Sequence, residues 1–243
     1  MRKAAVLTAV LALAAGIIGG TSEAAVQETL FKDVSKRHWA RARIEQAVSR
    51  GYVTGYPDGS FHAQAVVTRA EFIKMVVSAL RLPHSQGGLP WYQGYVSAAL
   101  EFGILNDTDS TDYGNPIKRV EMVRILSRAL ALEAPYRDYL ESFQALAKDD
   151  MTFEDRAQLQ NRDVPYIALA YGAGIVNGFP DRTIQVYRTA TRAETIVMME
   201  TWLEARKVDP LSKERLRQFM AVIENDSTRI EEITSSIQEE IEG

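Results

Sequence analysis

The sequence of 243 residues contains no cysteine, so disulfides, thiol nucleophiles and thiolate metal sites are excluded. Histidine is scarce too, and the spacing of His38, His62 and His84 is not that of metal ligands. An excess of positive charge is lacking, because 28 Lys and Arg stand against 32 Asp and Glu. Such a balance gives no electrostatic footprint for nucleic acid. We therefore expect no metal, no cofactor and no nucleic-acid partner.

Motifs of the common enzyme classes are also missing. There is no Gly-rich phosphate loop, no G-x-S-x-G elbow and no H-E-x-x-H string. Asp107, Asp109 and Asp112 imitate a calcium loop, but the positions where an EF-hand needs Gly and Glu hold Asp112 and Lys118. The sequence therefore predicts a protein that is not an enzyme.

Long apolar runs are lacking except at the start of the chain. Arg2 and Lys3 precede an apolar stretch at 4–19, and a small-x-small cleavage pattern follows at 22–24. Glycines interrupt this stretch, which falls short of the roughly 20 apolar residues of a membrane-spanning helix. We predict a cleaved signal peptide at 1–24 rather than a membrane anchor. The mature protein is then secreted and does not insert into the membrane.

What the sequence does contain is a repeated pattern. Gly51, Gly103 and Gly174 each end an amphipathic stretch, where a left-handed residue is typical of a helix C-terminus. Apolar residues stand seven and four positions before each Gly, which is helical spacing for one buried stripe. These residues are Ile44, Val96 and Ile167, and Ala47, Ala99 and Ala170.

A second helix is predicted after each of these glycines. Thr68-Arg69-Ala70-Glu71 and Thr191-Arg192-Ala193-Glu194 are capping boxes, in which Thr accepts from the N3 amide and Glu reaches back to the cap amide. The middle copy reads Lys118-Arg119-Val120-Glu121, which keeps Arg and Glu but loses the Thr cap. The middle copy is therefore degenerate.

Together, Phe31-x-Asp33-Val34, the Trp39 helix, Gly55-Tyr56-Pro57-Asp58-Gly59 and the Thr-Arg-Ala-Glu motif resemble the S-layer homology family over about 29–206. The resemblance implies a mainly α fold, in which three helix-loop-helix repeats form a pseudo-threefold prism around a central helical bundle, with ligand grooves between the units. The expected segments are repeats at 29–83, 90–133 and 150–206 and a helical insertion at 134–149.

Arg69, Arg119 and Arg192 are the first candidate ligand residues. We expect them to be exposed in the first helical turn, where a cation is slightly unfavourable, so their repetition indicates another role. The guanidinium fork suits a carboxylate, and a helix N-terminus adds free amides. The resemblance implies that such residues bind acidic, often pyruvylated, cell-wall polysaccharide. The degeneracy of the middle copy predicts that Arg119 contributes least. Because the side chains are expected to be exposed, replacing both Arg69 and Arg192 should leave the fold intact.

The segments Gly55-Tyr56-Pro57-Asp58-Gly59 and Gly178-Phe179-Pro180-Asp181 are predicted turns. They also add candidate ligand residues, because Gly55 and Gly178 would let a sugar approach the backbone, and Tyr56 or Phe179 would supply an apolar face. Asp58 and Asp181 belong to the same candidate set. The middle copy lacks this Pro-Asp turn, so its groove is expected to be the weakest.

Four more candidates come from the start of each unit. Asp33 and Asp155 precede helices, where caps are their commonest role, and in the family this Asp often accepts sugar hydroxyls as well. Trp39 and Trp91 share one helix position, and partial burial in the core is preferred there over contact with sugar.

The tail begins with Asp209 as a cap and Pro210, and isoleucines and leucine recur every seven residues through 209–243. This pattern predicts a helix that forms a coiled coil with a second copy or a partner, or packs back on the repeats. We interpret the chain as a non-catalytic module that anchors itself to the bacterial cell wall through acidic polysaccharide. The alternatives are a self-assembling structural protein of the envelope and an accessory subunit that brings a partner enzyme to the wall.

Overall fold

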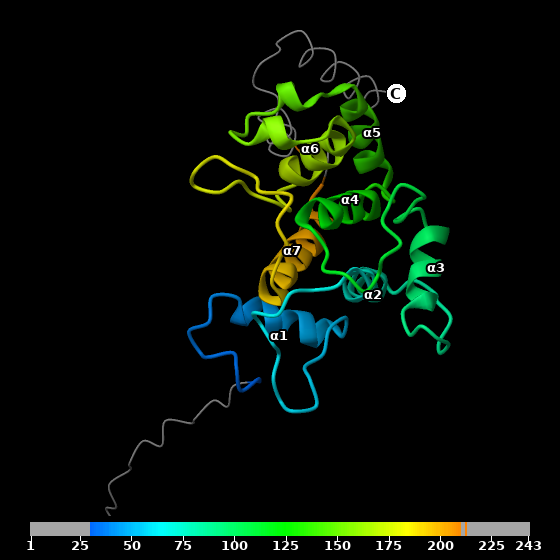
Figure 1. Cartoon of the computed structure of the whole chain (residues 1–243), viewed down its shortest axis with the longest axis vertical. Coiled ribbons are helices and arrows are strands. Elements are labelled where there is room, and N and C mark those ends of the chain that lie inside the picture. The colour runs from blue at the N-terminus through cyan, green and yellow to red at the C-terminus, as the bar shows by residue number, and fades with distance from the viewer. Residues whose placement is uncertain (1–29, 210–211, 213–243) are drawn as a thin grey trace, which may run out of the picture.

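The computed structural model describes residues 30–209 and 212. Within them the fold is mainly α, as the sequence predicts, with isolated bridges and no strand in the described part (Figure 1). The predicted signal peptide at 1–24 and nearly all of the predicted tail helix at 209–243 lie outside the described residues. The α-helices are α1 (Arg41–Arg50), α2 (Arg69–Leu80), α3 (Gln93–Glu101), α4 (Arg119–Leu130), α5 (Ala134–Ser142), α6 (Val164–Gly172) and α7 (Arg192–Ala205).

Three helix pairs, α1/α2, α3/α4 and α6/α7, are arranged as a ring (Figure 1). The second helices α2, α4 and α7 occupy the middle of the molecule, and the first helices lie outside them. Each first helix packs on the second helix of the preceding pair, so α3 lies on α2, α6 on α4, and α1 on α7. The contact of α1 with α7 closes the ring.

The helix ends have the predicted chemistry. Thr68 and Thr191 accept from the N3 amides of α2 and α7, and Glu71 and Glu194 accept from the cap amides, so both capping boxes are confirmed. The predicted left-handed glycines have φ of 80°, 69° and 72° at Gly51, Gly103 and Gly174. The predicted apolar stripe is buried, which places α1, α3 and α6 against the core.

The N-termini of the central helices are joined to neighbouring loops at the centre of the ring. The first amide of each helix donates to a backbone carbonyl of the following pair. These bonds are Arg69 to Asn115 (3.1 Å), Arg119 to Arg188 (2.9 Å) and Arg192 to Ala65 (2.7 Å). The second amides repeat the arrangement, from Ala70 to Tyr113, Val120 to Val186 and Ala193 to Ala63. The three pairs therefore make the same contacts around a pseudo-threefold axis, although the middle pair has a divergent motif.

Helix α5 and four 3₁₀ turns lie between α4 and α6. The turns are η1 (Phe143–Ala145), η2 (Lys148–Asp150), η3 (Arg156–Gln158) and η4 (Asn161–Asp163). The hydroxyl of Tyr136, which is buried in α5, donates to the carbonyl of Ala205 at the end of α7 (2.8 Å). Helix α5 falls inside the segment predicted as an insertion. Among the described helices, none has the length and hydropathy of a membrane span.

Candidate ligand grooves

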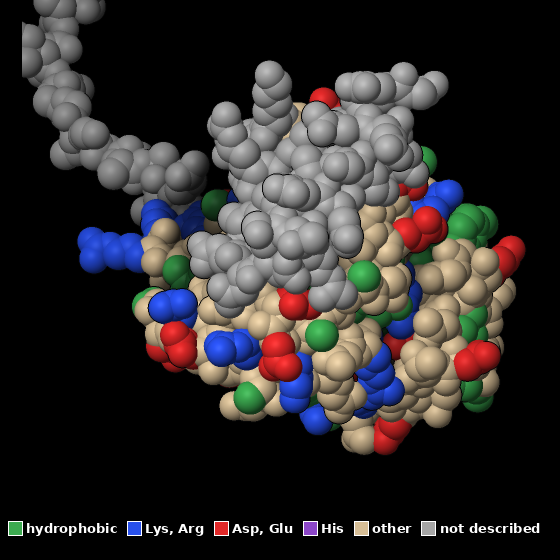
Figure 2. Space-filling view, turned by 90° about the horizontal axis from the view of Figure 1, so that it is seen from above, with side chains coloured by type: hydrophobic (Ala, Val, Ile, Leu, Met, Phe, Trp, Pro, Cys, Tyr) green, Lys and Arg blue, Asp and Glu red, His purple; other side chains and the backbone are tan. Residues whose placement is uncertain are grey.

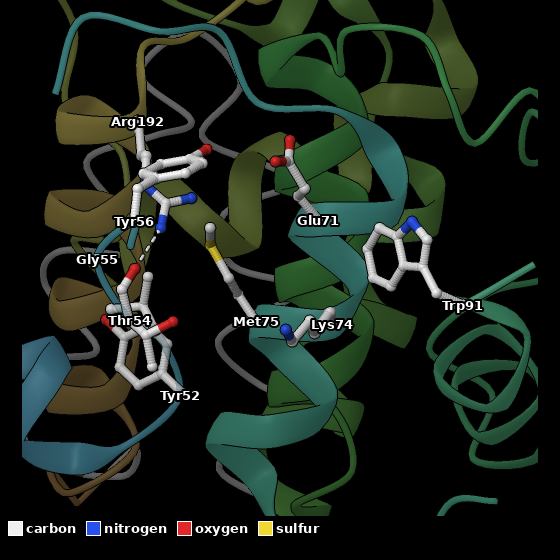
Figure 3. Close-up of a pocket in the computed structure, with 10 residues that line it drawn as sticks. Tyr52, Thr54, Gly55, Tyr56, Glu71, Lys74, Met75, Trp91 and Arg192 are labelled. Atoms are coloured by element: carbon white, nitrogen blue, oxygen red, sulfur yellow. Dashed lines mark hydrogen bonds between the residues drawn. The ribbon is translucent and has the colours of Figure 1, made fainter. Parts of the chain in front are cut away.

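Three surface grooves lie between the helix pairs, and each is named here after the pair whose loop forms its wall. Groove 1, about 310 Å³, is formed by the first pair (Figure 3). Loop 52–56 forms one side, and Glu71, Lys74 and Met75 of α2 form the floor. Trp91, just before α3, and Arg192, from α7, complete it.

Groove 3, about 230 Å³, has corresponding residues in corresponding places. Loop residues 175–179 replace 52–56, and Glu194, Val197 and Met198 of α7 replace Glu71, Lys74 and Met75. Trp39, from the first pair, and Arg119, from the second pair, line it as well, together with Arg188 and Thr201 of the third.

Groove 2, about 310 Å³, belongs to the middle pair and has a different character. Arg69 enters it from the first pair, and Arg162 from the third pair lies where the other grooves have Trp. The remaining lining residues are Thr108, Asp109, Ser110, Lys118, Val120, Glu121, Arg124, Gln160, Asp163 and Tyr187.

Each groove therefore takes its motif arginine from the preceding pair. Arg192 faces the loop of the first pair, Arg69 faces that of the second, and Arg119 faces that of the third. The arginine of the degenerate motif thus lies against the intact Gly-Phe-Pro-Asp turn. Arg69, from an intact motif, lies in the groove of the degenerate pair. The prediction that Arg119 contributes least to binding assumed that each arginine serves the groove of its own pair, and this assumption is wrong.

Arg192 is only 7% exposed and rests on aromatic rings. Its guanidinium carbon is 4.7 Å from the ring centroid of Phe61 and 5.4 Å from that of Tyr56. Its Nη2 donates to the carbonyl of Thr54 (2.9 Å), as Figure 3 shows. Burial lowers the pKa of Arg192, although Tyr56 and Glu71 oppose this effect. The cation is oriented but not neutralised by a carboxylate.

Arg119 is 8% exposed, and its charge has fewer stabilising contacts than that of Arg192. Its guanidinium lies 5.6 Å from the ring centroid of Phe179, and Arg188 lies 5.3 Å from the same ring. Burial and the charge of Arg188 both lower the pKa of Arg119, although the charge of Glu194 opposes them. Arg188 pairs with Glu194 (2.7 Å), whereas the side chain of Arg119 has no hydrogen bond or ion pair in the described part of the chain. A buried charge without a partner is costly, so groove 3 is electrostatically incomplete.

Arg69 is neutralised within the protein. Its Nε and Nη2 donate to the two carboxylate oxygens of Glu121 at 2.6 and 2.9 Å, and its Nη1 donates to the carbonyl of Asp112 (3.0 Å). Further ion pairs join Arg124 to Asp163 (3.2 Å) and Arg128 to Asp109 in the same region. The buried guanidinium groups of groove 2 therefore already have anionic partners.

Two expectations about these arginines are corrected. They were predicted to be exposed, but Arg119 and Arg192 are buried, and the Arg69 side chain is mostly covered by its pair with Glu121. The helix amides were predicted to be free for an anion, but the first two amides of each central helix donate to neighbouring loops. The cationic side chains that line the grooves, rather than these helix amides, are left to bind an anion.

Asp33 and Asp155 do not cap helices. The carboxylate of Asp33 accepts from the amides of Phe61 and His62, both at 2.7 Å, and Asp155 accepts from Ile184 (3.0 Å) and Gln185 (2.9 Å). His62 and Gln185 both have positive φ, at 56° and 48°, which is unusual for residues with side chains. The two aspartates therefore hold equivalent strained loops, and neither lines the grooves described above.

Trp39 and Trp91 are not core residues, unlike Trp202, which is fully buried. Trp39 is 62% exposed and Trp91 51% exposed, and each forms the outer edge of a groove. Packing in a core was preferred because Trp is usually mostly buried. Their rings are instead available to a ligand that enters groove 3 or groove 1.

The two predicted turns form as expected, but only some of their residues line a groove. Tyr56 and Phe179 line grooves 1 and 3 under the arginines. Asp58 and Asp181 accept from the hydroxyls and amides two residues later and line none of the three grooves. A side chain at Gly55 would lie 2.1 Å from the ring of Phe31, so packing alone requires glycine there.

Sequence reasoning missed several groove residues. Lys74 and Glu71 could have been found, because they lie one helical turn apart on the face that starts at the capping box. Arg188 and Asn177 lie in loops without periodicity, so no sequence signal indicates them. On the face shown in Figure 2, basic and acidic side chains are interspersed and do not form a single-sign patch.

Comparison with known proteins matches the first and third helix pairs to a known family. The family model of the S-layer homology domain matches residues 30–73 and 155–196. An amylopullulanase of Thermoanaerobacterium thermosulfurigenes is 30% identical over 184 residues, which cover 72% of this chain and 9% of that protein. An S-layer protein of Bacillus thuringiensis subsp. finitimus is 30% identical over 129 residues, covering 49% and 16%.

A cellulosome-anchoring protein of Acetivibrio thermocellus is 42% identical over 53 residues, which cover 22% of this chain and 12% of that protein. The chain spans less than a fifth of the length of each of these three relatives. The two matched segments hold the walls of groove 1 and groove 3, including both intact turns and both capping boxes. The chain thus carries S-layer homology domain sequence at 30–73 and 155–196.

Proposed function

We propose that this chain is a non-catalytic binding module that holds on to the bacterial cell wall. Its ligand is a wall polysaccharide that carries carboxylates, such as pyruvate ketals. The ligand enters groove 1 and groove 3. Arg192 and Arg119 bind the carboxylates there, and the exposed rings of Trp91 and Trp39 contact the sugar faces. The names of an S-layer protein and a cellulosome-anchoring protein among the relatives support location at the cell surface.

The observation that carries the proposal is the unpaired, buried guanidinium of Arg119. A charge in this position destabilises the fold unless something compensates it. A carboxylate in groove 3 would complete a bidentate, charge-assisted pair, which is a strong interaction in a partly desolvated site. Arg188 is close enough to add to the attraction, and its own pair with Glu194 keeps it in place.

We also propose that the middle pair, at 90–133, is a third and divergent S-layer homology repeat. The support is the repeated set of central hydrogen bonds, in which the middle pair makes the same contacts as the other two. Its role in this proposal is structural, because it completes the ring and supplies Arg119 to groove 3. Groove 2 binds an acidic sugar more weakly than groove 3, because its buried arginines are already paired and its remaining cations, Arg162 and Lys118, are exposed to solvent.

The test is cosedimentation of Arg→Met variants with purified cell-wall sacculi, alongside a thermal melt. Arg119→Met should weaken binding tens-fold, because a charge-assisted bidentate contact is worth about 2 kcal/mol. Its melting temperature should be unchanged or higher, since an unpaired buried charge is replaced by an apolar chain of similar length. Binding should also disappear when the polysaccharide is removed chemically from the sacculi.

Arg69→Met is the matched control, with the opposite signature. It should leave binding within about twofold and lower stability by about 3 kcal/mol, because Glu121 is left buried without its partner. Unchanged binding of both Arg119→Met and Arg192→Met would refute the carboxylate mechanism. Self-assembly and delivery of a partner enzyme depend on the tail at 209–243, and no described contact favours either.

A further inference from the structure

A second hollow adjoins groove 3 and shares lining residues with it. It measures about 600 Å³ and is lined by Thr152, Phe153, Tyr171, Asn177, Gly178, Phe179 and Arg182. Asn177 and Phe179 line both hollows. Phe179 therefore lines groove 3 together with Arg119, and it lines the second hollow together with Phe153 and Tyr171.

The chemistry of this hollow, called here the side hollow, suits an uncharged sugar. The partly exposed ring of Tyr171 lines the hollow and packs edge to face on the nearly buried ring of Phe153, with centroids 5.1 Å apart. Its side-chain donors and acceptors include the Thr152 hydroxyl, the Asn177 amide and Arg182, whose charge is balanced by Glu154 (3.4 Å). Hydroxyl and amide groups can bond to sugar hydroxyls, and an aromatic ring can pack against a sugar face, so this mixed lining suits an uncharged sugar.

The turn of the first pair packs more closely on its aromatic ring. A side chain at Gly55 would lie 2.1 Å from the ring of Phe31, whereas one at Gly178 would lie 3.3 Å from the carbonyl of Thr183 and 3.7 Å from the ring of Phe153. Thr152, before Phe153, corresponds to Leu30, before Phe31, and Leu30 is 52% exposed. The ring of Phe153 is thus held less closely against its turn than the ring of Phe31.

Volume supports joint use of the two hollows. Groove 3 alone, at about 230 Å³, is smaller than the roughly 300–1,000 Å³ of typical ligand sites. Together with the side hollow it falls within that range.

We infer that groove 3 and the side hollow form one extended site that binds two consecutive sugars of the polysaccharide. The acidic sugar lies against Arg119, and its uncharged neighbour lies against Phe153 and Tyr171, with Phe179 between them. This inference rests on the proposed function. It adds that the site binds two consecutive sugars rather than one, and that the second sugar is uncharged.

The experiment measures the affinity of the full chain for the acidic sugar alone and for wall polysaccharide fragments in which that sugar carries its uncharged neighbour. Groove 1 is disabled by Arg192→Met throughout, because a long fragment could otherwise bridge two grooves and gain affinity by avidity alone. We expect the fragments with the neighbour to bind at least ten-fold more tightly than the acidic sugar alone. Thr152→Phe should remove this gain by filling the side hollow, without weakening the binding of the acidic sugar alone.

Leu30→Phe, at the matched place in the first pair, is the control and should keep the full gain from the neighbour. Thermal melts confirm that each variant is folded. Equal affinity for the acidic sugar with and without its neighbour, or an unchanged gain in Thr152→Phe, would overturn the extended site. If Arg119→Met left the binding of every fragment unchanged, the proposed function itself would fail, and the two failures are thus distinguishable.

Discussion

At the scale of single residues, identical positions in the repeated motif have acquired different electrostatic environments. Arg69 is neutralised by Glu121, and Arg192 is oriented by Thr54 and aromatic rings. Arg119 lies over the ring of Phe179 and is attracted by the charge of Glu194, with no hydrogen bond or ion pair from its side chain among the described residues. The difference arises because each arginine meets the loop of another pair, and those loops diverge in sequence. We therefore expect replacement of Arg119 to weaken ligand binding more than stability, and replacement of Arg69 to lower stability more than binding.

Asp33 gives a prediction about pH. Burial alone would raise its pKa, but the amides of Phe61, Ala63 and His62 outweigh that effect and hold the pKa below its usual value. A lowered folded-state pKa contributes stability that is present above the unfolded value of about 3.9 and is lost as pH falls through the folded value. Asp33→Asn should cost about 1 kcal/mol at pH 7, since the acceptor loses its charge at an exposed site.

The measurement is urea unfolding of the wild type and Asp33→Asn between pH 7 and pH 2. The difference between them should shrink below about pH 4, where the wild-type carboxylate begins to take up a proton. Glu101→Gln, at an exposed position at the end of α3, serves as the control. A difference that stays constant down to pH 2 would contradict the role assigned to the Asp33 carboxylate.

At the scale of elements, the three central helices start with the same backbone geometry but unequal caps. Thr68, Lys118 and Thr191 have φ of −79°, −86° and −72°, with ψ of 162°, 152° and 162°. Glu121 still accepts from the Lys118 amide (2.9 Å), so half of the capping box survives in α4. What α4 lacks is a side-chain acceptor for its N3 amide.

Lys118→Thr should therefore stabilise the protein by about 1 kcal/mol, because the backbone is already placed for a Thr cap. Thr191→Ala should destabilise it by a similar amount. Both changes are measured by chemical denaturation at constant pH, with the slope of the transition checked for constancy. A loss of stability in Lys118→Thr would show that the Lys118 side chain has a role of its own in groove 2, which it lines.

At the scale of the whole molecule, the ring is closed between the first and last described α-helices. The fully buried carboxylate of Glu200 in α7 accepts from the hydroxyl of Tyr52 (2.9 Å) and pairs with Arg50 (3.3 Å), both at the end of the first helix. Arg43 of α1 pairs with Glu204. These contacts join the first pair to the third, and both contribute walls to groove 1.

Tyr52→Phe should destabilise the protein by about 1–3 kcal/mol, because a buried carboxylate loses a donor. In a double-mutant cycle with Glu200→Leu, the combined cost should be clearly smaller than the sum of the two single costs. Urea unfolding measures all four proteins of the cycle. Additive costs would mean that the two groups act independently and that this hydrogen bond does not hold the ring closed.

The sequence by itself determined the helix starts at Thr68 and Thr191, the left-handed glycines at the ends of the first helices, and the buried stripes. It did so because torsion preferences, caps and burial are encoded by residues within a few positions of each other. Only the tertiary structure decided which loop each arginine faces, why Trp39 and Trp91 are exposed, and what Asp33 holds. Arg192 meets Thr54 across 138 residues, and such pairings follow from how each helix pair packs on the next around the ring.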